Sequence, residues 1–201
     1  MALVIGLDIG TSRVKATVCN DQGATVFSRS EGAYETTYPN PGWAEQSPDE
    51  WWAAAKKVLG DVLQNEDVAG EKLAGIGLTG QMHGPVLLGK DGEVLSPCMI
   101  WSDTRASEES NQILKEVDGI TDITGNPPTA NFTAPKLLWL RENREKLSKK
   151  IWKVLLPKDF INFKLTGNIT TDPSDASGTL LYDIRKDNWA GEVTEKLNIN
   201  N

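Results

Sequence analysis

Hydrophobic and polar positions change period along the chain, first strand-like, then helical, then alternating between the two. An apolar run from Leu3 reaches Asp8, and Gly10, Thr11 and Ser12 follow before a second strand-like run, 14–18. This pattern predicts a β-hairpin whose turn region carries a carboxylate, a glycine and two hydroxyls.

The segments after the hairpin indicate the fold class. A third strand is expected over 24–27, and its continuation to Ala33 stays open. Ser47-Pro48-Asp49-Glu50 has a capping serine followed by proline, which predicts the start of a helix with one buried face. The run 73–79 is predicted to be a buried strand parallel to its neighbour. Three strands followed by alternating helices and strands indicate an α/β domain with a mixed sheet.

Composition narrows the choice of partners and compartment. The 201 residues include 39% hydrophobic ones, enough for a core in one large domain or two small ones. The formal charge of −7 argues against binding to nucleic acid or to an anionic membrane. The two cysteines lack metal-site spacing, and no apolar run approaches a membrane span. Together with an N-terminus unlike a signal peptide, these features favour the cytoplasm.

The predicted turn has the chemistry of a phosphate site. Gly10 has no side chain, so an anion can approach the backbone closely, and Thr11 or Ser12 can add a hydroxyl. Asp8 is placed to hold Mg²⁺ directly or through water, because Mg²⁺ prefers a few carboxylates together with phosphate oxygens. The alternative is an edge hairpin with a polar turn.

Several stretches, in order and spread over the whole chain, resemble one family. The loop 6–12 is similar to the first phosphate loop of the actin, heat-shock ATPase and sugar kinase superfamily. Five further stretches resemble the N-terminal domain of the FGGY carbohydrate kinases, most closely the xylulose kinases: 80–84, 100–105, 132–139, 155–159 and 174–179.

The resemblance implies a fold and a domain role. It implies a ribonuclease H-like, actin-like ATPase domain with a mixed five-stranded sheet flanked by helices. Residues 1–201 would be the N-terminal sugar-binding domain, and the nucleotide-binding domain would lie beyond them. The catalytic aspartate of the family, in a Gly-Gly-Asp-Asn-like stretch, is not found before Asn201. We therefore expect a truncated chain that is inactive alone.

The implied reaction is transfer of the terminal phosphoryl group of ATP, with Mg²⁺, to D-xylulose to give D-xylulose 5-phosphate. The alternatives are a kinase for another pentulose or polyol, such as L-ribulose or glycerol, and a non-catalytic sugar-binding or scaffold domain. We also expect self-association, a homodimer included, through the apolar face against which the second domain would pack.

The resemblance also assigns roles in the phosphate loop and the sugar site. Asp8 would help to place Mg-ATP, with Gly10, Thr11 and Ser12 as the phosphate loop. Its structural alternative is a buried turn carboxylate that accepts backbone N–H bonds.

Gln81, Met82 and His83 would meet the sugar. Glycerol kinases carry an Arg-Glu pair at the position of Met82 and His83, so Met-His favours xylulose. Without the family, Met82 would be core, Gln81 a loop brace and His83, the one histidine, a structural residue.

Three further residues are candidates for the sugar site. Trp101 could cover a sugar face or pack in the core, and Asp103 could bind hydroxyls or, slightly favoured, cap a helix. Asn131 falls where glycerol kinases carry a ligand tyrosine. Lys136, Asp159 and Asp175 match family positions and are interpreted as structural.

Overall fold

The computed structural model describes residues 2–32 and 34–199, which form two compact units. Unit 1 comprises Met1–Glu35, Ser47–Gln81 and Pro157–Asn168, and unit 2 comprises the three remaining segments. Unit 1 contains β1 (Ala2–Ile9), β2 (Arg13–Cys19), β3 (Thr25–Gly32), α1 (Pro48–Gln64), β5 (Lys72–Gly80) and α6 (Pro157–Thr166).

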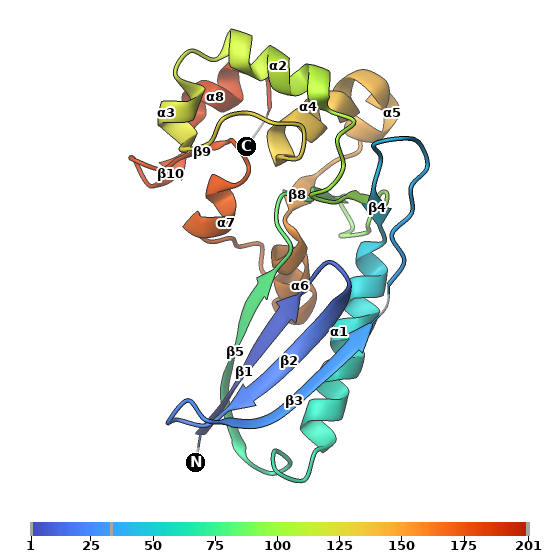
Figure 1. The fold of residues 1–201 in the computed structure, drawn as a ribbon, viewed down its shortest axis with the longest axis vertical. Coiled ribbons are helices and arrows are strands. Elements are labelled where there is room, and N and C mark those ends of the chain that lie inside the picture. The colour runs from blue at the N-terminus through green and yellow to red at the C-terminus, as the bar shows by residue number, and fades with distance from the viewer. Residues whose placement is uncertain (1, 33, 200–201) are drawn as a thin grey trace. The chain divides into compact units, whose positions relative to one another are not determined.

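The sheet of unit 1 is mixed, as predicted, and has the order β3-β2-β1-β5 (Figure 1). β2 pairs with β1 and with β3 in antiparallel fashion, whereas β5 runs parallel to β1. The described residues give this sheet four strands, so the expected count of five is wrong for this part of the chain. The predicted hairpin, the third strand and the parallel strand are confirmed; Ala33 lies outside the described residues.

One face of the sheet forms the core of unit 1. Odd-numbered residues of β1 and even-numbered residues of β2 are buried, because successive side chains point to opposite faces. The helix α1 packs against β2 and β3, with Trp51, Val58 and Val62 fully buried. Its predicted start is correct, with Ser47 as the N-cap residue and Pro48 in the first turn.

β5 differs from the prediction in one respect. It is parallel to β1, but most of its residues are exposed, including Ile76 at 43%. Among the described residues, β1 is the only strand that pairs with it, so it is an edge strand. A parallel strand is buried when helices and strands cover it, and that cover is not supplied by these residues.

Unit 2 is mainly helical. Its elements are β4 (Glu45–Gln46), β6 (Val86–Leu88), β7 (Cys98–Met99), α2 (Ser107–Glu116), α3 (Ile120–Thr124), α4 (Thr133–Asn143), α5 (Glu145–Ser148), β8 (Lys153–Leu155), α7 (Pro173–Ser177), β9 (Tyr182–Asp183), β10 (Asn188–Trp189) and α8 (Gly191–Lys196). Three two-stranded ladders join β4 to β7, β6 to β8 and β9 to β10. One hydrophobic cluster, which includes Ile113, Leu138 and Val193, packs the helices together.

Within 2–32 and 34–199, no helix is long and apolar enough to cross a bilayer.

Candidate functional site

The predicted phosphate loop of unit 1 is a short turn between β1 and β2. Gly10 N donates to Arg13 O at 3.1 Å and closes the turn over Thr11 and Ser12. Asp8 lies two residues earlier on the exposed face of β1, directly opposite Lys15 of β2. The exposure of Asp8 contradicts the alternative of a buried turn carboxylate. The carboxylate and the loop therefore share one accessible edge of the hairpin.

The backbone of the hairpin passes so close to Gly10 that a side chain there would be crowded. A Cβ atom at Gly10 would lie 3.1 Å from Arg13 O and 3.9 Å from Asp8 Oδ2. Glycine at this position therefore lets the Arg13 carbonyl approach closely enough to close the turn beside Asp8.

Tyr34 supports this loop and was missed at the sequence level. Its hydroxyl donates to Gly10 O, and its ring packs edge-on against Trp51 with centroids 6.5 Å apart. Burial, and then the charge of Asp8, raises the pKa of Tyr34 far above its ordinary value, so the hydroxyl stays protonated and remains a donor. No local sequence signal marks Tyr34, because the contact joins residues 24 positions apart.

The donor set around Asp8 fits Mg²⁺ held jointly with a phosphate. One carboxylate and two hydroxyl residues supply oxygen atoms, which Mg²⁺ prefers. A search of the described residues finds no group of three or more His, Cys, Asp or Glu that could hold a metal ion. The residues that the structure describes offer only part of a coordination shell, and water and phosphate oxygens would complete it.

Gln81 and Met82 have different environments. Gln81 N donates to Ile9 O at 2.8 Å, and its side chain is buried in unit 1. This backbone bond agrees with its alternative role as a loop brace. Met82 belongs to unit 2 and is 51% exposed, so the alternative of a core methionine is wrong.

His83 is half-buried in unit 2 and held by several contacts. Its Nδ1 lies 2.8 Å from Gly178 O, and its ring centroid is 4.4 Å from that of Phe132, the neighbour of Asn131. Burial is the main cause that lowers the pKa of His83, the bond to Gly178 opposes the shift, and the charge of Lys136 adds to it. The imidazole is therefore neutral near pH 7 and can exchange hydrogen bonds with hydroxyls.

Trp101 and Asn131 are accessible candidates. Trp101 is 43% exposed, which contradicts the alternative of core packing. Asn131 is half-buried, and its Oδ1 accepts from Thr129 Oγ1.

Asp103 does not cap the helix that follows it. It is completely buried and accepts from Ala44 N at 2.7 Å and from the Arg105 guanidinium. The helix α2 begins at Ser107 with Ala106 at its cap, so the favoured prediction of Asp103 as a helix cap is wrong. The other prediction, that Asp103 binds sugar hydroxyls, stays a prediction, and both oxygens of this carboxylate already accept hydrogen bonds inside the protein.

Arg105 and Lys136 complete a buried charge network around Asp103. Arg105 Nη2 is 2.7 Å from Glu45 Oε1, and its guanidinium carbon lies 3.6 Å from the ring centroid of Trp43. Lys136 Nζ donates to Ile100 O at 2.9 Å, at the residue before Trp101. The network ties the Trp101 segment to α4, and the sequence patterns did not reveal it because its members are far apart in the chain.

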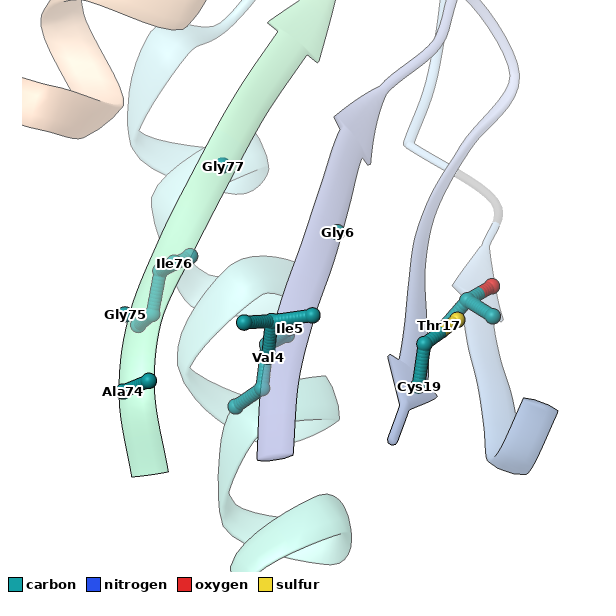
Figure 2. A pocket seen from close by; sticks show the side chains of 9 residues that line it. All are labelled: Val4, Ile5, Gly6, Thr17, Cys19, Ala74, Gly75, Ile76 and Gly77. Carbon is teal, nitrogen blue, oxygen red and sulfur yellow. The ribbon is translucent and has the colours of Figure 1, made fainter. Parts of the chain in front are cut away.

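The pocket drawn in Figure 2 lies elsewhere, on the sheet of unit 1. Its nine lining residues come from the first half of β1, the end of β2 and the middle of β5, and none is a predicted site residue. Thr17 and Cys19 are its only hydroxyl and thiol. Since β2 ends where β1 begins, the pocket lies at the opposite end of the hairpin from Gly10.

Comparisons with known proteins identify the family of the chain. Residues 3–201 match the family described as the FGGY family of carbohydrate kinases, N-terminal domain. A xylulose kinase from Staphylococcus xylosus is 40% identical over 201 residues, covering 99% of this chain and 41% of that protein. The crystal structure of a xylulose kinase from Rhodospirillum rubrum is similar with a TM-score of 0.92 and 30% identity, covering 98% of this chain and 41% of that chain.

A more distant relative belongs to another substrate class. A glycerol kinase from Thermococcus kodakarensis is 33% identical over 201 residues, covering 98% of this chain and 40% of that protein. The chain spans 40–41% of the length of these three relatives.

Proposed function

The chain belongs to the FGGY family of carbohydrate kinases, and on that premise we propose that residues 1–201 are the sugar-binding part of an enzyme that phosphorylates D-xylulose with ATP. The product would be D-xylulose 5-phosphate. The observation that carries the proposal is the loop with Met82 and His83: an exposed methionine beside a neutral, fixed imidazole. Similarity to xylulose kinases over almost the whole chain supports the same substrate.

We propose that the sugar site is built from unit 2. His83 would exchange hydrogen bonds with hydroxyl groups, and Trp101 would cover an apolar face of the sugar, which its exposed ring permits. Asn131 lies next to Phe132, which contacts His83, and is proposed as a weaker contact. Gln81 would act mainly through its backbone bond to Ile9.

The hairpin of unit 1 would serve the nucleotide. Asp8 would hold Mg²⁺ and through it the ATP phosphates, and Thr11 and Ser12 would offer backbone and hydroxyl donors beside Gly10, whose own N–H closes the turn. Phosphoryl transfer depends mainly on positioning and on neutralising charge, so a single carboxylate in this place matters greatly. We further propose a cytoplasmic enzyme whose partner is a small sugar.

A polyol kinase is the second candidate. The relative from Thermococcus kodakarensis is a glycerol kinase, and its identity to this chain is 33% against 40% for the xylulose kinase of Staphylococcus xylosus. A non-catalytic sugar-binding domain is a further alternative. Such a domain would need the sugar site of unit 2 but not the hairpin with Asp8, so the presence of that hairpin favours the kinase.

Titration calorimetry tests the proposal directly. D-xylulose, L-ribulose and glycerol are titrated into the chain and into the His83→Ala variant. We expect D-xylulose to bind most tightly and the variant to lose at least about 10-fold in affinity, the effect of about one hydrogen bond. Tyr38→Ala is a suitable control, since Tyr38 is 71% exposed. Preference for glycerol, or equal binding by the His83 variant, would contradict the D-xylulose site.

A further inference from the structure

The backbone at His83 has a conformation that residues other than glycine rarely adopt. Its φ is +66°, in the left-handed region. Gly84 N donates to Met82 O at 2.8 Å, which makes His83 the centre of a three-residue γ-turn. Such a strained turn persists only where neighbouring groups fix it, and strain of this kind gathers at ligand sites.

Two hydrogen bonds from distant segments fix the turn and its side chain. Thr133 Oγ1, at the start of α4, donates to His83 O at 3.1 Å. His83 Nδ1 lies 2.8 Å from Gly178 O, at the end of α7. A carbonyl oxygen only accepts, so the hydrogen of this bond belongs to Nδ1. In a neutral imidazole, Nε2 then carries no hydrogen and is an acceptor.

Gly178 provides the space for this bond. A Cβ atom at Gly178 would lie 2.9 Å from both Cε1 and Nδ1 of His83, a distance that real Cβ atoms essentially never show. Its own φ of −74° is ordinary for any residue. The imidazole is therefore the main reason for the glycine, since the one backbone atom of the turn that a Cβ would approach, Asp175 O, lies farther away at 3.3 Å.

We propose that Gly178 and Thr133 are positioning residues that hold His83 as its Nδ1–H tautomer, so that Nε2 accepts a hydrogen bond from a sugar hydroxyl. This inference rests on the proposed function. The inference fixes the direction of the hydrogen bond at His83 Nε2: the ligand donates and the imidazole accepts. A free hydroxyl meets that need, whereas an ether or keto oxygen at the same position only accepts. The lowered pKa of His83 agrees with a ring that stays neutral.

Nitrogen NMR of the imidazole tests the tautomer without any ligand. His83 is the only histidine, so ¹⁵N-labelled chain gives one imidazole spin system. At neutral pH we expect Nδ1 to be protonated and Nε2 unprotonated. Gly178→Ala should abolish this preference, whereas Ser177→Ala should keep it, since the Ser177 hydroxyl bonds to Ser174 O and not to His83. Protonated Nε2 in the unmodified chain would overturn the proposal.

A second pair of variants covers the case in which Gly178→Ala does not fold. Thr133→Val removes the hydroxyl at nearly constant volume, and Thr133→Ser retains it. We expect Thr133→Val to weaken D-xylulose binding at least about 5-fold and to give a mixture of the two His83 tautomers. Thr133→Ser should keep both the affinity and the Nδ1–H tautomer of the unmodified chain. Equal tautomer ratios in the two variants would count against a positioning role for Thr133.

D-xylulose then tests the acceptor role of Nε2. Added sugar should shift the Nε2 resonance toward that of a hydrogen-bonded acceptor. If calorimetry shows D-xylulose binding while the Nε2 resonance stays unchanged, the inference fails and the proposed function stands. If D-xylulose does not bind, the proposed site in this chain is contradicted, and the tautomer in the free chain decides the positioning role.

Discussion

The hydroxyl of Tyr34 makes one hydrogen bond that supports the turn between β1 and β2. It donates to Gly10 O from a buried position, and replacement by phenylalanine leaves that carbonyl without this donor. We expect Tyr34→Phe to lower the free energy of unfolding by about 1 kcal/mol, a typical value for one such bond. Urea denaturation measures the change. Tyr38→Phe is the matched control because Tyr38 is 71% exposed, and an equal loss in both variants would contradict the role of Tyr34.

Lys136 makes stability depend on pH in a defined window. Burial is the main cause that lowers its pKa from 10.5 to about 8. Between these two values the unfolded chain holds a proton on this lysine that the folded chain has lost. Folding stability therefore rises with pH across this window, and the cost of burying the charged form is fully present below pH 8.

The Lys136→Met variant isolates this contribution. Near pH 7 it should be less stable by about 2–3 kcal/mol, because Ile100 O loses its donor and the remaining charges of Glu45, Asp103 and Arg105 no longer balance. Its deficit relative to the unmodified chain should grow from pH 8 to 10 as measured by denaturant unfolding. Lys149→Met, at an exposed pair with Glu145, should change stability by at most about 0.5 kcal/mol. A deficit independent of pH would contradict the lowered pKa.

Two helix starts look alike in sequence and differ in structure. Ser47 precedes Pro48 of α1, and Asp172 precedes Pro173 of α7. The Ser47 side chain makes no capping hydrogen bond, and the Glu50 carboxylate accepts from Glu35 N instead of closing a capping box. The Asp172 carboxylate accepts from Asp175 N at 3.1 Å.

These caps should therefore respond differently to alanine. Asp172→Ala should cost about 1 kcal/mol of unfolding free energy, the usual value for a lost cap, and Ser47→Ala at most about 0.5 kcal/mol. Thermal or urea unfolding of both variants provides the comparison. If Ser47→Ala lowered the free energy of unfolding more than Asp172→Ala, the capping hydrogen bond would not explain the difference between the starts of α1 and α7.

Elements with a strong local signal were predictable, and features set by distant contacts were not. The Asp8 hairpin and α1 follow from runs of apolar residues and from Ser47-Pro48, which act within a few positions. The exposure of β5 depends on what covers it, which its own apolar sequence does not encode. Asp103 looked like a cap because it precedes a helix, yet Ala44 and Arg105 use its oxygens.

In the candidate site, too, residues in short motifs were predictable and the residues that support them from a distance were not. Family motifs indicated Asp8, the turn after it and His83 from short stretches of sequence. The groups that fix them, Tyr34 for Gly10 and Gly178 for His83, come from 24 and 95 residues away in the chain. A glycine whose purpose is to make room for a ring has no sequence signature of its own, since its φ is ordinary.

At the scale of the whole chain, the two edges of the sheet differ in their protection. β3 carries Arg29 and Glu31, which pair with Asp61 and Lys57 of α1 at 2.8 and 2.6 Å. The stretch 73–80 in β5 has no charge and no proline, and the described residues offer it no partner beyond β1. Charges and prolines are the usual means by which edge strands avoid pairing with other chains.

We therefore expect a second copy of the chain to pair at β5. An isologous contact brings the same strand from both copies together in antiparallel fashion, so one exposed edge suffices for a twofold dimer. Sedimentation velocity across a range of concentrations should show reversible association. Ile76→Lys should suppress it, because Ile76 is 43% exposed and a lysine there charges the edge without filling the core. Ser30→Lys on the already charged β3 edge should leave it unchanged. Association that survives Ile76→Lys, or a monomer at every concentration, would remove β5 as the contact.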